Sequence, residues 1–88
     1  MTDDAPAIEF PCEFPIKVMG HDRPAFHRAA RELVERHAGP LPDGAIRSAT
    51  SRNGRFVSLT LTIEAQSRRQ LDAIYLELTR HEEILVAL

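Results

Sequence analysis

The segment Arg55–Glu64 alternates apolar and polar side chains, which is the pattern of a β-strand with one covered face. Its two faces differ in character. One is aliphatic and the other is largely hydroxylic, the first formed by Val57, Leu59, Leu61 and Ile63 and the second by Phe56, Ser58, Thr60 and Thr62. A chain with this strand must fold into a sheet that is covered on one side and open to solvent on the other.

Two helical patterns supply the cover. In two segments, residues recur at helical spacing and form a mainly apolar stripe. The first stripe consists of Phe26, Ala29, Ala30, Leu33, Val34 and His37, and the second of Leu71, Ile74, Tyr75 and Leu78. Ser67 and Gln70 form a capping-box signature before the second stripe. Asp22 is expected to cap the first helix, and Pro24 fits its first turn.

Three further segments predict strands. Residues 13–19 alternate in the same way, residues 45–52 are polar enough for a sheet edge, and residues 84–88 are apolar. Asn53-Gly54 predicts a tight type I′ hairpin turn. The order βαββαβ then favours a ferredoxin-like α+β sandwich, with a four-stranded antiparallel sheet and two helices on one face. We assign residues 12–88 to this single domain and residues 1–11 to a flexible acidic tail.

Composition limits the classes of function. Eleven Lys and Arg face thirteen Asp and Glu, a net charge of −2, which disfavours nucleic acid as a partner. A single cysteine, Cys12, excludes an intrachain disulfide, and the four histidines lack the spacing of a helical metal site. No metal or cofactor is expected. No signal peptide or membrane-spanning run is recognised, so a cytoplasmic protein with no membrane contact is expected.

Three stretches of the chain resemble a known family. They resemble the YbeD-like family of small bacterial proteins of unknown function. The stretches are Phe10–Gly20, Ser51–Thr60 and Gln70–Tyr75, the last together with the terminal Val86-Ala87-Leu88. The resemblance implies a fold similar to the ACT domains that sense amino acids, and a link to lipoate metabolism. It also implies that the loop after the first strand binds a small ligand, although Ala25 stands where ACT domains often carry a second glycine.

That loop contains the candidate ligand-binding residues Gly20, Asp22 and Arg23. A glycine allows close approach to the backbone, and a helix N-terminus offers free N–H donors. The Arg23 guanidinium could pair with a carboxylate. Against this stands a well-capped turn without a ligand, in which Asp22 already supplies the anion.

The open face of the sheet is the second candidate surface. It is predicted to carry Lys17, Met19, Phe56, Ser58 and Thr60, and a partner protein or a second copy of the chain could cover it, although a solvated face is the plain alternative. No catalytic residue is predicted, because Asp22 would repel a phosphate where acylphosphatases of this fold bind one. The leading hypothesis is a non-enzymatic regulatory or adaptor domain that binds a small metabolite or a partner protein. The alternative is a nucleic-acid-binding module that uses Lys17, Arg55 and Phe56.

Overall fold

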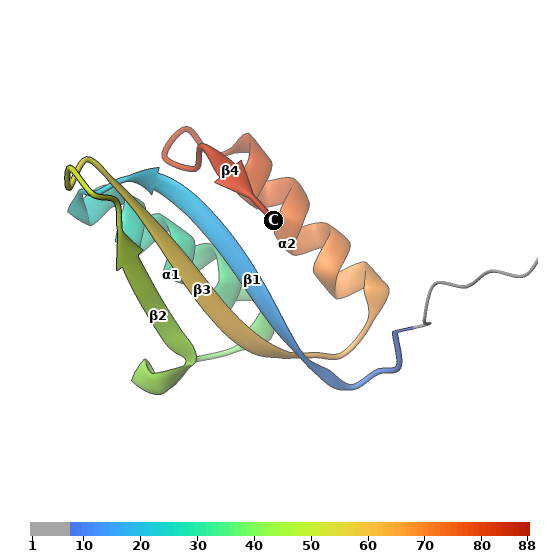
Figure 1. The fold of residues 1–88 in the computed structure, drawn as a ribbon. Coiled ribbons are helices and arrows are strands. Elements are labelled where there is room, and N and C mark those ends of the chain that lie inside the picture. The colour runs from blue at the N-terminus through green and yellow to red at the C-terminus, as the bar shows by residue number, and fades with distance from the viewer. Residues whose placement is uncertain (1–7) are drawn as a thin grey trace, which may run out of the picture.

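The computed structural model describes residues 8–88, which form a four-stranded antiparallel sheet with two helices packed on one face (Figure 1). The strand order β2-β3-β1-β4 places β1 and β3 at the centre and β2 and β4 at the edges. This is the predicted βαββαβ sandwich. The elements are β1 (Cys12–His21), α1 (Pro24–Ala38), a 3₁₀ turn η1 (Asp43–Ala45), β2 (Ile46–Thr50), β3 (Phe56–Ala65), α2 (Arg68–Arg80) and β4 (Val86–Ala87).

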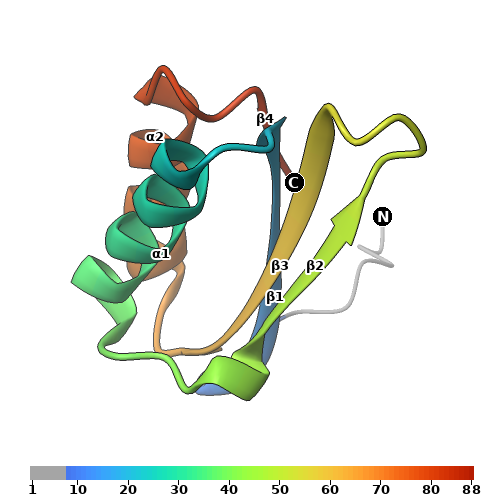
Figure 2. The same ribbon diagram turned by 90° about the vertical axis from the view of Figure 1, so that its left-hand side faces the viewer.

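The core lies between the sheet and the helix layer, as Figure 2 shows edge-on. The aliphatic side of β3 faces the helices, as the alternation in Arg55–Glu64 predicted. Both central strands and both helices contribute fully or nearly fully buried side chains, including Ile16, Val18, Val57, Leu59, Leu61, Ile63, Phe26, Val34, Leu71, Ile74 and Leu78. With only one aromatic ring among them, the core is mainly aliphatic. Within residues 8–88, no helix lies on the opposite face of the sheet.

The two helices begin differently. Ser67 caps α2 as predicted, because its hydroxyl accepts a hydrogen bond from the Gln70 backbone N–H at 3.1 Å. The expectation for Asp22 is wrong. Arg23 is the residue before α1, no side chain caps that end, and the Asp22 carboxylate instead lies 2.8 Å from His27 Nε2. Pro24 does occupy the first turn of α1, where its missing N–H removes one unsatisfied donor.

The β2–β3 connection is not the predicted two-residue turn. Gly54 is its one residue with positive φ, at 76°, so Asn53 does not adopt the left-handed conformation that a type I′ turn requires. The Asn53 side chain explains the difference, because its Oδ1 accepts hydrogen bonds from the Arg55 N–H at 3.1 Å and the Ser51 hydroxyl at 3.0 Å. Ser51 N–H then closes the loop by donating to the Phe56 carbonyl.

The chain ends differ in part from the expectations. The final strand β4 is shorter than residues 84–88, because Ile84 turns into the core, but Leu88 still exchanges two backbone hydrogen bonds with Lys17 on β1. Of the predicted tail, residues 1–7 lie outside the described residues. Phe10 packs against the core.

Candidate functional site

The loop after β1 is filled by protein atoms at Gly20. A Cβ atom at this position would lie 2.6 Å from Phe26 Cε1 and 2.7 Å from the Glu83 carbonyl oxygen, both far inside ordinary contact distance. The glycine therefore lets the first turn of α1 and the segment before β4 pack closely on β1. This close packing explains why position 20 is a glycine, and the explanation requires no ligand.

The charged residues of the same loop already have partners. Arg23 Nε lies 3.3 Å from Glu83 Oε1, and Asp22 is held by His27. A ligand carboxylate arriving at Arg23 would meet the negative charges of Glu83 and Asp22, which oppose its binding. Gly20, Asp22 and Arg23 do lie together as expected, and their ligand-binding role stays a prediction.

The open sheet face places the five predicted contact residues together. Met19 and Ser58 are direct cross-strand neighbours, as are Lys17 and Thr60, and Phe56 stands one pair further along, opposite His21. Phe56 and Met19 are 37% and 36% exposed, which is high for large apolar side chains on a central strand. These neighbours make one continuous surface.

Two side chains that sequence reasoning missed extend this surface. Val86 on β4 pairs with Met19 and is 42% exposed, which lengthens the apolar row toward the sheet edge. The His21 ring lies 4.9 Å from the Phe56 ring, centroid to centroid, at an angle of 32°. His21 continues the alternation that starts at Glu13, and this signal could have identified it. A shallow depression of about 150 Å³ lies beside Met19 and Phe56.

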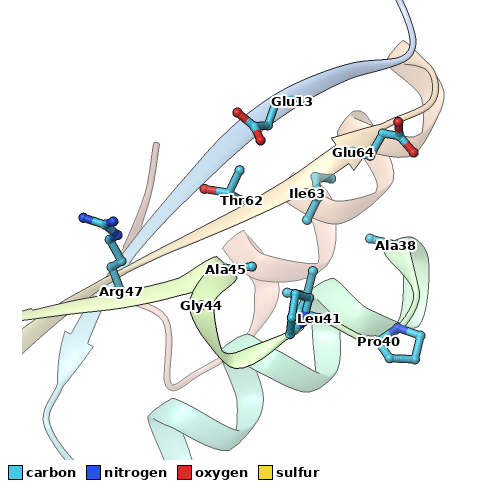
Figure 3. Close-up of a pocket in the computed structure, with 11 residues that line it drawn as sticks. Glu13, Ala38, Pro40, Leu41, Gly44, Ala45, Arg47, Thr62, Ile63 and Glu64 are labelled. Atoms are coloured by element: carbon cyan, nitrogen blue, oxygen red, sulfur yellow. The ribbon is translucent and has the colours of Figure 1, made fainter.

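A larger cavity of about 580 Å³ opens at the other end of the sheet, where η1 meets β3 (Figure 3). Small and apolar residues line it together with four polar or charged ones; the first group is Ala38, Pro40, Leu41, Pro42, Gly44, Ala45 and Ile63, and the second is Glu13, Arg47, Thr62 and Glu64. Sequence reasoning missed this cavity, because the path of residues 39–45 is set by tertiary contacts. Arg47, an isolated charge in a short strand, was the one feature of the sequence that could have pointed to this cavity.

The wall of the cavity is fixed by an ion pair on α1. The Glu35 carboxylate accepts a 2.7 Å hydrogen bond from the Leu41 backbone N–H and one of 3.2 Å from Arg31 Nε. Arg31 also donates to the Leu41 carbonyl at 3.0 Å. Leu41 is thus held at both its backbone groups. The hydrogen bond from the Leu41 N–H, aided by Arg31, holds the pKa of Glu35 below its ordinary value.

This arrangement predicts a pH-dependent stability. A carboxylate whose pKa is lower in the folded state stabilises the fold above its unfolded pKa of about 4.5, and the effect is lost as pH falls through the folded value. We expect Glu35→Gln to lower the urea midpoint at pH 7, and we expect the deficit to shrink as the pH falls through the lowered pKa of Glu35. Glu32→Gln, an exposed position on the same helix, is the control and should show little change. A deficit independent of pH, or one shared by Glu32→Gln, would contradict this role of Glu35.

Other site classes find no support between residues 8 and 88. No group of three or more His, Cys, Asp or Glu side chains in this range could hold a metal ion. No helix in the same range is long and apolar enough to cross a bilayer. Cys12 is half-buried at the start of β1.

Fold and surface together define a small ferredoxin-like α+β domain with one open sheet face and a cavity at its edge. The solution structure of protein HP0495 from H. pylori has the same fold, with a TM-score of 0.69 at 20% identity, over 97% of this chain and 89% of that one. At this identity the likeness concerns the fold alone.

Sequence comparison then gives the family. The model described as "Protein of unknown function (DUF493)" matches residues 5–88. UPF0250 proteins of Nitrosomonas europaea and Chromobacterium violaceum are 40% and 42% identical to this chain over the full length of each. A UPF0250 protein of Azotobacter vinelandii is 46% identical over 89% of each chain. The chain belongs to this DUF493/UPF0250 family, the YbeD-like family predicted from its sequence.

Proposed function

We propose that this chain is a non-enzymatic cytoplasmic adaptor domain that binds a partner protein through the open face of its sheet. One observation carries the proposal: Phe56, Met19 and Val86 lie exposed on neighbouring positions of an uncovered sheet. Aromatic and Met side chains are enriched at the centres of protein interfaces. We call these three residues the apolar row.

The surroundings of the apolar row favour a protein over a small metabolite. The depression beside it holds about 150 Å³, well below the roughly 300–1,000 Å³ of typical small-molecule pockets. The Gly20 loop, which is the predicted metabolite site, is occupied by the Phe26 ring and by the Arg23–Glu83 pair. A broad, shallow, mildly apolar face with Lys17 beside it suits a protein surface of opposite charge.

Nucleic acid is the second candidate, and one observation favours it. The His21–Phe56 ring pair spans the two central strands, and Lys17 and Arg47 stand on the same face. Single-stranded nucleic acids bind to such sheets by stacking bases on aromatic side chains. The net charge of −2 and Glu13 with Glu64 at the far end weaken this candidate.

The proposal is tested by capture from a bacterial lysate on immobilised wild-type protein, Phe56→Ser and Leu76→Ser. Leu76 is the matched control, because it is 50% exposed but lies on α2, away from the open face. Loss of an interface hot spot costs about 2 kcal/mol or more, so we expect retention of the specific partner to fall about thirtyfold for Phe56→Ser and to persist for Leu76→Ser. Circular dichroism confirms that both variants fold.

Three results would overturn the adaptor proposal. Equal retention by all three proteins would exclude the apolar row from the interface. Retention that is lost on nuclease treatment and falls steeply with salt would support the nucleic-acid candidate instead. If sedimentation shows that the apolar row pairs only with a second copy of the chain, the surface is a homodimer interface and not an adaptor site.

A further inference from the structure

We propose that the open face of the sheet recognises an acidic segment of its partner protein, in which one apolar side chain is flanked by carboxylates. The apolar side chain fills the depression beside Met19 and Phe56, and the carboxylates meet cations on either side of that depression. This inference rests on the adaptor function proposed above and gives the chemistry of the partner.

The depression has room for a single side chain. It holds about 150 Å³, and most of the surface that it exposes is apolar. Its centre is a line of three direct cross-strand neighbours, Met19, Ser58 and Ala49, and Phe56 lies beside them. An aliphatic side chain that enters this depression leaves water for apolar contact, which favours binding.

Two cations lie on one side of the depression. Lys17 and Arg47 both pair with Thr60, so the three residues form a line across β1, β3 and β2. Met19 and Ala49 follow two residues later on the same strands and therefore on the same face. The line of Lys17 and Arg47 is thus about 7 Å from the centre of the depression along the strands. Both side chains are exposed.

Two more cations lie beyond the other end of the depression. Arg52 and Arg55 belong to the loop between β2 and β3, which connects Thr50 to Phe56, and both of these residues line the depression. The loop is held by its own hydrogen bonds, including the one from the Ser51 N–H to the Phe56 carbonyl at 2.8 Å. The two exposed arginines are therefore kept at this end of the open face.

The protein does not neutralise these four cations. Between residues 8 and 88 the ion pairs lie on the helices and the segments next to them, and none involves Lys17 or the three arginines. The open-face carboxylates of Glu13 and Glu64 are six residues along their strands from Met19 and Ser58, or about 20 Å away. The surroundings of the depression are thus positive, although the whole chain has a net charge of −2. A positive rim favours a negative partner.

The depression favours a protein segment over a nucleic acid, which the same cations would also attract. Bases bind to an open sheet by stacking on the flat face of an aromatic ring. A recess of this size, with Met19 and Ala49 in its lining, instead admits an aliphatic side chain. Carboxylates on either side of a leucine or isoleucine satisfy both the recess and the cations.

The test is an NMR titration of the ¹⁵N-labelled full chain with the peptide acetyl-Ser-Glu-Glu-Leu-Glu-Glu-Ser-amide, which presents the same side chains in either chain direction. We expect saturable shifts of the amides of Met19, Ala49 and Ser58. One control peptide has Ser in place of Leu, and the other has Gln in place of every Glu. We expect each to bind about tenfold more weakly, because the first lacks the apolar anchor and the second lacks the charges.

Charge reversal in the loop locates the contact. The double variant Arg52→Glu/Arg55→Glu should weaken binding of the acidic peptide by about tenfold. Arg68→Glu/Arg69→Glu is the matched control, because it makes the same change of net charge at exposed positions of α2, and it should leave the affinity unchanged. The ¹⁵N spectrum shows at the same time whether each variant is folded. Raising the salt concentration from about 0.05 M to about 0.5 M should weaken binding to the wild type, because exposed charges are screened.

Four results would overturn the inference. They are the absence of saturable shifts, equal affinity of the Glu and Gln peptides, equal affinity of the Leu and Ser peptides, and equal effects of the two double variants. Displacement of the peptide by a single-stranded DNA decamer that binds more tightly would also overturn it, in favour of nucleic acid. If the peptide fails to bind but capture from lysate still depends on Phe56, the adaptor function stands and only the acidic partner is excluded.

Discussion

Gly20→Ala is expected to destabilise the protein by about 3 kcal/mol, although it adds a single methyl group. In most strands this change removes backbone flexibility from the unfolded chain and stabilises the fold by about 0.5–1 kcal/mol. Here the new Cβ would lie 2.6 Å from a Phe26 ring carbon and 2.7 Å from a backbone oxygen of Glu83. Both neighbours are held by the packing around them. The free-energy cost of the steric overlap therefore exceeds the stabilisation that comes from a less flexible unfolded chain.

Thermal unfolding followed by circular dichroism measures the effect. For a domain of this size about 3 kcal/mol corresponds to a fall of the melting temperature by roughly 12–24 °C. Gly44→Ala is the control, because no atom lies within 4 Å of its Cβ position and its φ is not positive. The double variant Gly20→Ala/Phe26→Leu should lose less stability than the two single changes summed. A melting temperature unchanged by Gly20→Ala would show that α1 does not pack on β1 as described.

This result bears directly on the predicted ligand loop. A substitution at Gly20 changes the packing of Phe26 before it changes any contact with a ligand, so it cannot test ligand binding. Arg23→Ala is the informative change, because the Arg23 side chain is 57% exposed and its charged partner is Glu83. Weakened binding of a carboxylate ligand by Arg23→Ala, with the melting temperature kept, would support the predicted site.

The fold was predictable because local patterns and tertiary packing agree. The alternation around Leu59 and Leu61 set the buried face of β3, and the stripes that contain Val34 and Ile74 matched it with two helices. The Ser67 cap was predictable for the same reason, since capping is a local interaction. Asp22 failed as a cap because His27, one turn into α1, offers a competing partner for its carboxylate.

The candidate site was less predictable, because its parts meet only after folding. The five open-face residues followed from strand parity alone. The cavity did not, because it depends on where β2 begins relative to β3 and on the hydrogen bonds that hold Leu41. The pairing of Arg23 with Glu83 joins residues 60 positions apart, a separation at which no periodicity in the sequence can pair them.

Phe26 and Phe56 offer the sharpest test of the two-faced sheet, because one residue type occupies both sides. Phe26 is 0% exposed between the helices and the sheet, whereas Phe56 is 37% exposed on the uncovered face. We expect Phe26→Ala to cost about 3–5 kcal/mol through lost burial and a residual cavity. Phe56→Ala should cost less, about 1 kcal/mol, because part of this side chain is already exposed to solvent in the folded protein.

A loss of 3–5 kcal/mol approaches the whole stability of an 88-residue domain, which is about 4–13 kcal/mol. Phe26→Leu therefore accompanies Phe26→Ala as a milder variant that should remain folded and measurable by urea denaturation. Equal costs at the two positions would mean that the apolar row is buried in the free protein, which would remove the physical basis of the proposed interface. A loss of stability at Phe26 alone would show that Phe56 is not needed for folding. The exposed position of Phe56 would then be consistent with contact to a partner.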